Sequence, residues 1–310
     1  MAKRGRKKKT ERTNPDGLGE LSILPLKSDI IFRMIFADNR NIDILRCFLS
    51  AALDIPEAQF EEISVIDSHL ELESPDDKLG ILDVRVLTES GKRIDIEVQL
   101  RSFEFMPERI TFYTCKNLTT QIASGDGYEA IRKTITIVIL DFSLLDSPSY
   151  QHKFSLYDAR NQLQFTDVLE IYTLELPKLP AETDEEDLLL YWLRLFKAQR
   201  LEEYEMLAAK NPTIGKTVDI LKRLSADDKA RLAYEAREKT RRDELARIND
   251  ARNSGKIEGK IEGKIEGKIE GKLEARLEFA RNLIAEGFPP EQIARMSGLS
   301  LEEAQTLLNT

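Results

Sequence analysis

Two neighbouring segments of the chain carry polar side chains of the types that bind metal ions. Asp83 lies in residues 81–88 (ILDVRVLT), and Glu97 and Gln99 lie in residues 93–101 (RIDIEVQLR). Apolar and polar residues alternate in both segments, which is typical of β-strands. Because successive side chains of a strand point to opposite faces, Glu97 and Gln99 are predicted to share one face of the second strand.

A tight turn between the two strands would bring their acidic residues together. Residues 89–91 (ESG) fit a three-residue hairpin loop with the glycine in the left-handed conformation. This loop pairs Arg85 with Asp95 and Asp83 with Glu97, whose Cβ atoms would then lie about 5 Å apart. Like charges directly opposite one another destabilise a sheet, so the second pair calls for a cation.

A hard divalent ion would satisfy this arrangement of oxygen atoms. Mg²⁺ prefers carboxylate, carbonyl and water oxygens, and the candidate ligands are Asp83, Glu97 and the backbone carbonyl of Val98. Such an ion can activate water and stabilise charge on a phosphodiester. The alternative is that the two carboxylates form the solvent side of an exposed hairpin, neutralised by Arg85 and Arg93. Spacing alone favours the exposed hairpin over the metal site.

Periodic patterns predict the elements that must position these side chains. Apolar residues at three- and four-residue spacing predict one or two helices within residues 26–36 and 41–52. Residues 107–123 read as a helix that begins at a proline, and the β-branched run at 134–141 (TITIVILD) indicates a buried strand. The other expected elements are a strand at 61–67, strand-like segments at 151–156 and 169–176, and helices at 184–196 and 226–253.

Composition limits the classes of protein to which the chain can belong. Its 310 residues are 41% hydrophobic and 33% charged, with a net charge of −9, so a folded core is expected and uniform coating of nucleic acid is disfavoured. Two cysteines, Cys47 and Cys115, support neither a disulfide framework nor a cysteine-based zinc site. No apolar run approaches the ~20 residues that span a bilayer. We therefore expect a cytoplasmic protein with no membrane partner.

The two ends of the chain have unusual charge patterns. Residues 1–12 hold seven basic residues and one acidic residue, which indicates a solvated tail. Near the other end, Gly-Lys-Ile-Glu begins at residue 255 and recurs at 259, 263 and 267, followed by Gly-Lys-Leu-Glu at 271. Like charges at i,i+4 and repeated glycines disfavour an isolated helix. The repeat is therefore either a flexible linker or a helix that forms against a partner.

The last residues predict two short helices joined by a turn. Residues 290–296 and 301–309 have helical patterns, and Ser300 is suited to cap the second helix. The arrangement is similar to a helix-turn-helix. Because the second helix contains Glu302 and Glu303 but no arginine or lysine, a helical hairpin for packing or self-association is favoured over a reader of the DNA major groove.

The order of these motifs resembles the PD-(D/E)XK nuclease superfamily and, more narrowly, the Rpn family of recombination-promoting nucleases and transposases. The supporting strings are KSDIIF at residues 27–32, LDV at 82–84, IEVQ at 96–99, GDGY at 125–128 and LELPK at 174–178. The resemblance covers about residues 20–180. It implies an α/β fold with a restriction-endonuclease-like core, a mixed central sheet flanked by helices, followed by a helical C-terminal region.

The resemblance also implies roles for individual residues. Asp83 and Glu97 would bind the metal, and Gln99 would take the position of the motif lysine as the third catalytic residue. Glutamine can orient water but carries no charge. Asp29 on the first helix, and Arg109 with Tyr113 one helical turn apart, would support the site.

Two hypotheses follow for the function. The first is a Mg²⁺-dependent DNA endonuclease associated with recombination or transposition, with Mn²⁺ as an alternative ion. The second is a catalytically silent DNA-binding or assembly module that forms homo-oligomers through its C-terminal helices.

We expect five regions along the chain. They are a basic disordered tail at 1–19, the nuclease-like domain at 20–180, a helical region at 181–253, the repeat at 254–274 and a hairpin or helix-turn-helix-like tail at 275–310.

Overall fold

The computed structural model describes residues 23–66, 84–181 and 187–309. The basic tail at 1–19, Asp83 with the two residues before it, and the first residues of the helix expected at 184–196 lie outside the described residues. The chain divides into two compact units, Met1–Arg237 and Glu238–Thr310, and each is described by itself.

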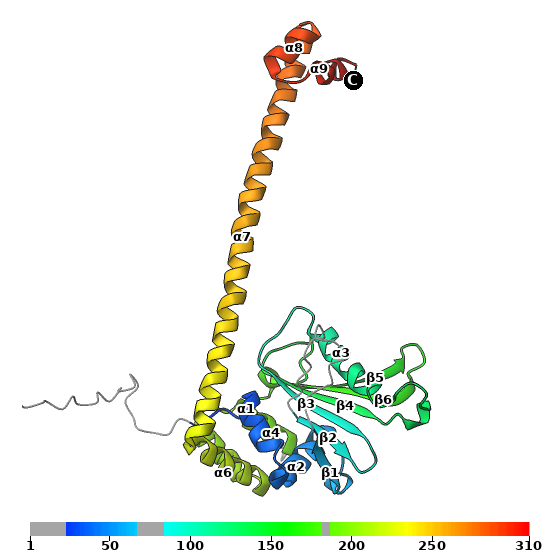
Figure 1. The fold of residues 1–310 in the computed structure, drawn as a ribbon, viewed down its shortest axis with the longest axis vertical. Helices are drawn as coiled ribbons and strands as arrows, with labels where there is room; N and C mark the ends of the chain where they lie inside the picture. Colours follow the sequence, from blue (N-terminus) through cyan, green and yellow to red (C-terminus); the bar gives the residue numbers. More distant parts are fainter. Residues whose placement is uncertain (1–22, 67–83, 182–186, 310) are drawn as a thin grey trace, which may run out of the picture. The chain divides into compact units, whose positions relative to one another are not determined.

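A mixed six-stranded sheet forms the centre of the first unit, as the sequence predicts (Figure 1). Its strands are β1 (Ile63–Ile66), β2 (Val84–Thr88), β3 (Arg93–Gln99), β4 (Thr134–Leu140), β5 (Gln151–Asp158) and β6 (Leu163–Glu175). The spatial order is β1-β2-β3-β4-β6-β5, with β3, β4 and β6 parallel and the other pairs antiparallel. Strand β3 therefore lies inside the sheet, with a partner on each side.

Helices cover both faces of this sheet. The helices of the first unit are α1 (Asp29–Phe36), α2 (Ile42–Leu53), α3 (Met106–Thr119), α4 (Leu188–Lys197), α5 (Leu201–Ala208), α6 (Pro212–Ala226) and the beginning of α7 (Asp228–Ala285). Short 3₁₀ turns occur at Asn39–Asn41, Glu57–Phe60, Tyr128–Ala130 and Leu176–Lys178. Helices α5 and α6 lie within the helical region expected at 181–253, although the sequence patterns do not single them out. Pro212 occupies the first turn of α6, where a proline is tolerated.

The larger core lies on the face covered by α1, α2, α4 and α6. At its centre the rings of Phe32, Phe36, Phe48, Trp192 and Phe196 pack with centroid separations of 4.6 to 5.9 Å. Two of these rings come from α4, which follows the boundary expected at residue 180. Helices on both sides of that boundary thus contribute to one hydrophobic core.

Helix α3 covers the other face of the sheet. Met106 and Ile110 pack against Val138, Leu140 and Ile171 of β4 and β6. This smaller core closes the side of the sheet toward which the polar side chains of β3 are directed.

The predicted β2–β3 hairpin is confirmed. Gly91 has φ +80°, and the backbone N–H of Thr88 donates to the carbonyl of Lys92 at 3.0 Å. Arg85 is paired with Asp95, as the loop length predicts. A Cβ atom at residue 91 would lie 3.0 Å from the side chain of Arg132, so the turn and its neighbour both favour glycine here.

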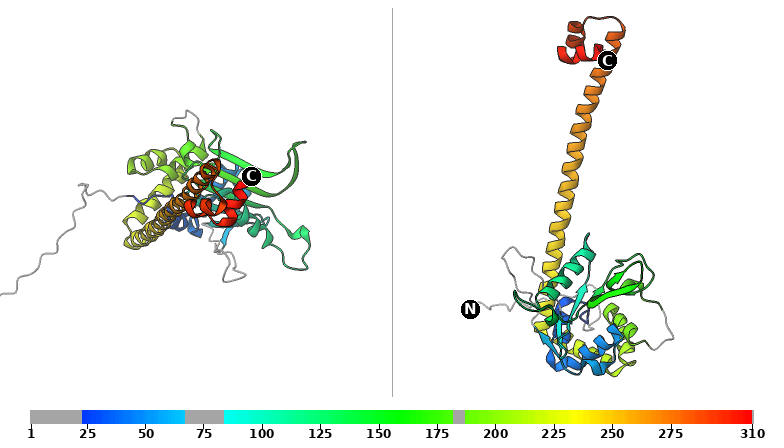
Figure 2. Two further views of the ribbon diagram at one scale, coloured as in Figure 1. Left: turned by 90° about the horizontal axis from the view of Figure 1, so that it is seen from above. Right: turned by 90° about the vertical axis from the view of Figure 1, so that its right-hand side faces the viewer.

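The second unit consists of the rest of α7 with α8 (Pro290–Ser297) and α9 (Leu301–Leu308). Figure 2 shows α8 and α9 folded against the end of α7, where Ala280, Leu283 and Ile293 belong to a small core. The side chain of Ser300 accepts a hydrogen bond from the N–H of Glu303, which confirms the predicted cap. Helix α7 continues through the tetrapeptide repeat.

None of the helices in the described residues combines the length and apolar character needed to cross a membrane.

Candidate active site

Glu97 is buried inside the sheet, near the C-terminal end of β3. Only 6% of the residue is exposed, because β2 and β4 flank its strand and α3 covers its face. The expectation of a solvent-exposed hairpin is therefore wrong for Glu97. The alternation of side chains is as predicted, but the polar face of β3 is turned toward a helix rather than toward water.

The nearest polar partner of the Glu97 carboxylate is the next residue on the same face. Gln99 donates a hydrogen bond from Nε2 to Oε2 of Glu97 at 3.0 Å. Burial raises the pKa of Glu97 to about 7; the Gln99 hydrogen bond and the charge of Arg109 lower this pKa, whereas the charge of Asp95 raises it. The folded protein thus stabilises this carboxylate poorly.

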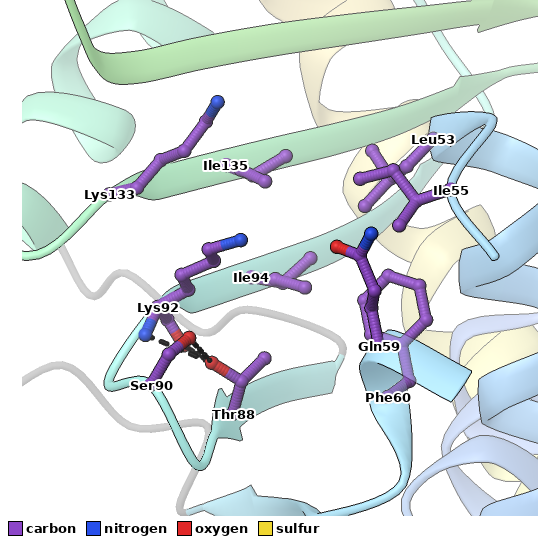
Figure 3. A pocket seen from close by; sticks show the side chains of 10 residues that line it. All are labelled: Leu53, Ile55, Gln59, Phe60, Thr88, Ser90, Lys92, Ile94, Lys133 and Ile135. Atoms are coloured by element: carbon purple, nitrogen blue, oxygen red, sulfur yellow. Dashed lines mark hydrogen bonds between the residues drawn. The ribbon is translucent and has the colours of Figure 1, made fainter. Parts of the chain in front are cut away.

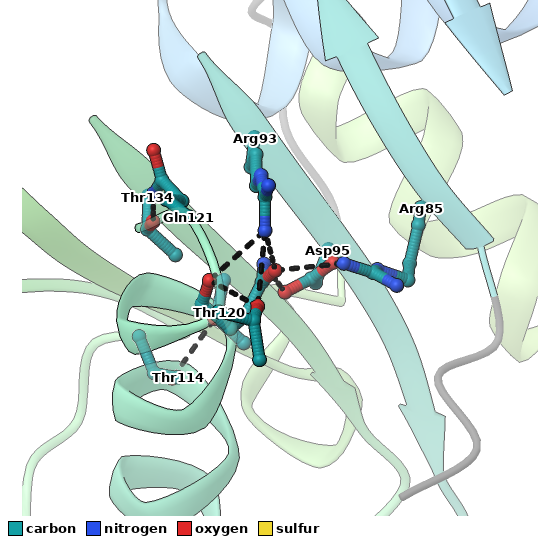
Figure 4. Close-up of polar contacts among 9 residues, drawn as sticks. Arg85, Arg93, Asp95, Thr114, Thr120, Gln121 and Thr134 are labelled. Carbon is teal, nitrogen blue, oxygen red and sulfur yellow. Dashed lines mark hydrogen bonds and ion pairs between the residues drawn. The ribbon is translucent and has the colours of Figure 1, made fainter. Parts of the chain in front are cut away.

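Asp95, two residues earlier, belongs to a more complete network (Figure 4). Arg85 lies 3.5 Å from its carboxylate, and the amide of Asn117 donates to the same carboxylate. Arg85 also donates to Oδ1 of Asn117 at 2.8 Å, so helix α3 joins the ion pair. Burial still raises the pKa of Asp95 to about 7, although Arg85, Asn117 and Arg93 all lower it.

A comparison of the buried carboxylates distinguishes Glu97 from the rest. Four are buried in the described part of the chain, and three of them form ion pairs. These pairs are Asp95 with Arg85 at 3.5 Å, Glu170 with Lys133 at 2.8 Å and Lys153 at 3.0 Å, and Glu175 with Lys178 at 2.7 Å. Glu97 has no cation within ion-pair distance among the described residues.

This arrangement fits the carboxylate ligand of a hard cation. A buried carboxylate that accepts one amide hydrogen bond from the described residues retains oxygen lone pairs for a further ligand, and Mg²⁺ and Mn²⁺ prefer such oxygens. Within the described ranges no group of three or more His, Cys, Asp or Glu side chains surrounds a common point. The second predicted ligand, Asp83, lies outside those ranges.

Arg109 and Tyr113 lie on α3, as predicted from the sequence. The guanidinium of Arg109 is 4.8 Å from the centre of the Tyr113 ring and 6.0 Å from that of Phe103. Tyr113 is buried and Arg109 is exposed. Because the charge of Arg109 acts on Glu97, α3 supplies a cationic side chain near the site without forming an ion pair.

Asp29 forms a different contact from the one expected. Its carboxylate lies 2.5 Å from Nη2 of Arg237, and no hydrogen bond or ion pair joins it to Glu97 or Gln99. The nearby Lys27 instead connects α1 to the end of the sheet, through an ion pair of 2.7 Å with Asp141. The backbone N–H of Asp141 donates to the carbonyl of Gln99, so this contact supports the end of β3.

Asn117 and Thr114 also belong to this region, although no sequence pattern predicts a role for them. Asn117 joins Arg85 to Asp95, and Oγ1 of Thr114 lies 2.9 Å from Oγ1 of Thr136 on β4. Both are buried polar residues on the face of α3 toward the sheet. The sequence signal for them is only that both are polar residues within a helical pattern. Their partners are 22 or more residues away, so no local pattern could reveal these contacts.

A small cavity lies near the other end of β3 and does not include Glu97 (Figure 3). Its volume is about 40 Å³, and Thr88, Lys92, Ile94 and Lys133 are among the residues that line it. A space of this size accommodates water molecules rather than a substrate. The candidate catalytic residues therefore lie at the opposite end of β3 from this cavity, at Glu97 and Gln99.

Comparison with known proteins gave one match. The model of a family described as PD-(D/E)XK nuclease family transposase matches residues 26–251, which is more than half of the chain. No curated protein and no solved structure matched. The matched range includes all six strands and the helices that surround them.

Proposed function

The chain belongs to the PD-(D/E)XK nuclease family of transposases, and from this membership we propose that it is a metal-dependent DNA endonuclease that acts in recombination or transposition. The observation that carries the proposal is the buried carboxylate of Glu97, which forms no ion pair with any described residue, whereas the other three buried carboxylates of the described residues do. A bound divalent cation would compensate this charge.

In the proposed site, Asp83, Glu97 and the backbone carbonyl of Val98 would hold Mg²⁺ or Mn²⁺. A bound divalent cation supplies an activated water and stabilises the charge that develops on the cleaved phosphodiester. Gln99 orients the attacking water through its amide, since it already lies within hydrogen-bond distance of Glu97. Arg109, exposed at the start of α3, contacts a phosphate of the DNA.

The test is cleavage of supercoiled plasmid DNA in the presence of Mg²⁺ or Mn²⁺. The wild-type protein is expected to produce nicked circles, and Asp83→Ala and Glu97→Gln are expected to lose at least about a hundredfold of this activity. Glu89→Gln is the matched control, because Glu89 is an exposed carboxylate on the loop of the same hairpin. It should cleave at the wild-type rate.

The position of Gln99 allows a sharper comparison. Gln99→Ala should lower cleavage, whereas Gln99→Lys, which restores the superfamily motif, should retain or raise it. Cleavage that persists in Glu97→Gln or in Asp83→Ala, with the variants folded by circular dichroism, would refute the proposed site.

A second function is favoured by a separate feature, a groove beside α4 and α5. This open groove has a volume of about 900 Å³ and a largely apolar lining. Among the described residues that line it, the charged ones are four basic residues and one acidic residue, Arg194, Lys197, Arg200, Lys210 and Glu203, and Arg200 pairs with Glu203. Such a surface suits a phosphate backbone even in an acidic protein. In this alternative the chain binds DNA without cutting it and assembles into homo-oligomers through its C-terminal helices.

The alternative differs from the nuclease in its response to ions. DNA binding through this groove should be independent of Mg²⁺ and should fall steeply as salt increases. Charge reversal at Arg194 and Lys197 should weaken binding of all sequences equally. If plasmid cleavage is absent in both metals while this binding is observed, the alternative replaces the nuclease.

A further inference from the structure

Three exposed phenylalanines lie next to the proposed active site, at the connection from β3 to α3. Phe103 and Phe105 occupy the loop that follows Gln99, and Phe112 lies on α3; they are 54%, 64% and 54% exposed. We propose that these three residues, the aromatic surface, stack against unpaired DNA bases, so that the preferred substrate is single-stranded or locally unpaired DNA. The inference rests on the proposed function.

Side-chain contacts connect the aromatic surface to Arg109 and Tyr113 of α3. The guanidinium of Arg109 lies between the Tyr113 ring, at 4.8 Å, and the Phe103 ring, at 6.0 Å. The Phe112 ring meets the Tyr113 ring edge-on with centroids 5.3 Å apart. The loop that carries Phe103 and Phe105 follows directly from Gln99, the hydrogen-bond partner of Glu97, so the aromatic surface begins a few residues beyond the proposed site.

The chemistry of this surface suits bases rather than a duplex. Exposed aromatic rings next to a cation are the combination by which proteins bind single strands, because every base offers a flat face for stacking and every nucleotide a phosphate. In a duplex these base faces are covered by neighbouring base pairs. Arg109 would contact the backbone while the phenylalanine rings contact the bases.

Binding can be tested separately from cleavage with the full-length Glu97→Gln variant. Oligonucleotides that contain 2-aminopurine are compared as a single strand and as the matching duplex, in Mg²⁺. We expect the single strand to bind at least about tenfold more tightly and its fluorescence to be quenched by stacking. The variant Phe103→Leu/Phe112→Leu should lose about tenfold or more in single-strand affinity and the quenching, with little change for the duplex.

Phe165→Leu is the matched control, since Phe165 is an equally large and more exposed ring on the β5–β6 hairpin. Added to Glu97→Gln, this substitution should leave the affinity for single-stranded DNA the same as that of Glu97→Gln alone. Equal affinity for duplex and single strand, or no effect of the double substitution, would overturn the inference. Absence of any DNA binding would also overturn it and would indicate that the aromatic surface contacts a protein. If the wild-type protein fails to cleave plasmid but the Glu97→Gln variant shows this preference, the nuclease proposal fails and the aromatic surface stands.

A second inference is carried independently by the repeat in α7. Ile257, Ile261, Ile265 and Ile269 are each more than half exposed, so a column of apolar side chains runs along this helix without cover. Within the helix, Lys and Glu are two residues apart and each repeats every four residues. The repeat therefore forms no opposite-charge pair at i,i+3 or i,i+4 and places like charges at i,i+4. The helix lacks the internal support that a single exposed helix normally needs.

The geometry points to a second copy of the chain, aligned parallel, as the partner of this face. At about 100° per residue, Lys lies about 100° to one side of each Ile and Glu about 100° to the other. When two such helices meet parallel through their isoleucines, the Lys flank of each faces the Glu flank of the other. In an antiparallel pair Lys would face Lys and Glu would face Glu. Charge thus selects the parallel arrangement.

The four-residue period also limits the length of the contact. The isoleucine column turns by about 40° per repeat, so three successive repeats stay within about 80° of arc. A period longer than 3.6 residues gives a right-handed wrap rather than the left-handed supercoil of a heptad. The contact is therefore short, covering about three repeats.

Light scattering and cysteine crosslinking of the full chain test this assembly. Cys115 is exposed and is first changed to serine, so that it forms no crosslink of its own. In this background, two copies of the Ile257→Cys variant should crosslink to each other under oxidation. A mixture of the Ile257→Cys and Leu273→Cys variants should give no crosslink between positions 257 and 273. Changing every repeat lysine to glutamate should dissociate the dimer. Exchanging all repeat lysines with all repeat glutamates should preserve it, because the flanks remain complementary. A monomer by light scattering, or crosslinks between positions 257 and 273, would overturn the proposal.

Discussion

At the level of single residues, Glu97 is held in the protein at an energetic cost. Its carboxylate is buried, accepts a hydrogen bond from Gln99 and has a pKa of about 7. Because this pKa lies above the ordinary value of 4.5, the stability of the fold decreases as pH rises from about 4.5 to about 7 and stays lower above pH 7. Retention of such a group is typical of sites that use the charge for binding or catalysis.

Glu97→Gln should consequently stabilise the protein in the absence of divalent ions. Glutamine has nearly the same shape and no charge, so at pH 8 the free energy of unfolding should rise by about 1 to 3 kcal/mol. Urea denaturation in EDTA measures this change. Addition of Mg²⁺ should stabilise the wild-type protein and leave Glu97→Gln unchanged; a loss of stability in EDTA would contradict the assignment of Glu97 as an uncompensated charge.

Glu170 should show the opposite behaviour. Its carboxylate is buried between Lys133 and Lys153, and hydrogen bonds from both lysines outweigh burial and lower its pKa below 4.5. A lowered pKa means that the ionised form stabilises the fold above pH 4.5 and that this stabilisation disappears as pH falls through the lowered pKa.

Glu170→Gln is therefore expected to lower the free energy of unfolding at pH 7 by about 2 kcal/mol, because two lysines lose their partner. The difference between variant and wild type should shrink below pH 4.5. Urea denaturation of both proteins at several pH values between 3 and 7 measures this difference in the free energy of unfolding. A difference that stays constant over this range would mean that Glu170 does not contribute through its charge.

At the level of elements, α3 determines the environment of the polar face of β3. Asn117 of α3 bonds to both Arg85 and Asp95, and Arg93 donates to the backbone carbonyl of Asn117 at 3.3 Å. One side chain thus connects the helix to two strands. The same helix carries Arg109 toward Glu97.

Asn117→Ala should destabilise the protein by about 2 to 3 kcal/mol, since it removes hydrogen bonds from a buried ion pair. Thr119→Ala, an exposed position two residues later on α3, should change stability by less than about 0.5 kcal/mol. Thermal and urea unfolding provide the comparison. Equal effects at the two positions would indicate that the network contributes nothing beyond helix propensity.

At the level of the whole molecule, the helices beyond residue 180 complete the main core. Trp192 and Phe196 of α4 pack against Phe32, Phe36 and Phe48 of the first two helices, mostly edge-on. Removing them would expose a large part of the apolar surface that supports the sheet.

A chain that ends at residue 180 is therefore expected to lack cooperative unfolding, whereas one that ends at residue 237 should unfold in a single transition. Near-ultraviolet circular dichroism and urea denaturation separate the two outcomes. Within the longer chain, Trp192→Ala should cost about 3 to 5 kcal/mol. A folded, cooperative chain of 180 residues would instead support the domain boundary expected from the sequence.

Much of the local structure follows from short stretches of sequence. The alternation in residues 81–101 and the glycine at its turn predict the register of β2 and β3, which the observed pairing of Arg85 with Asp95 confirms. Ser300 predicts the start of α9. These features depend on neighbouring residues, so a linear pattern is sufficient to predict them. The prediction that Asp83 faces Glu97 extends the same register and remains a prediction.

The tertiary structure alone decided the chemical character of Glu97. Alternation assigns a side chain to one of two faces but cannot tell whether that face meets water or a helix. Burial of Glu97 depends on β4 and α3. That Glu97 forms no ion pair with a described residue depends on where Arg85, Lys133, Lys153 and Lys178 are directed. Most of these contacts join residues distant in sequence, and only their packing turns a polar face into a candidate active site.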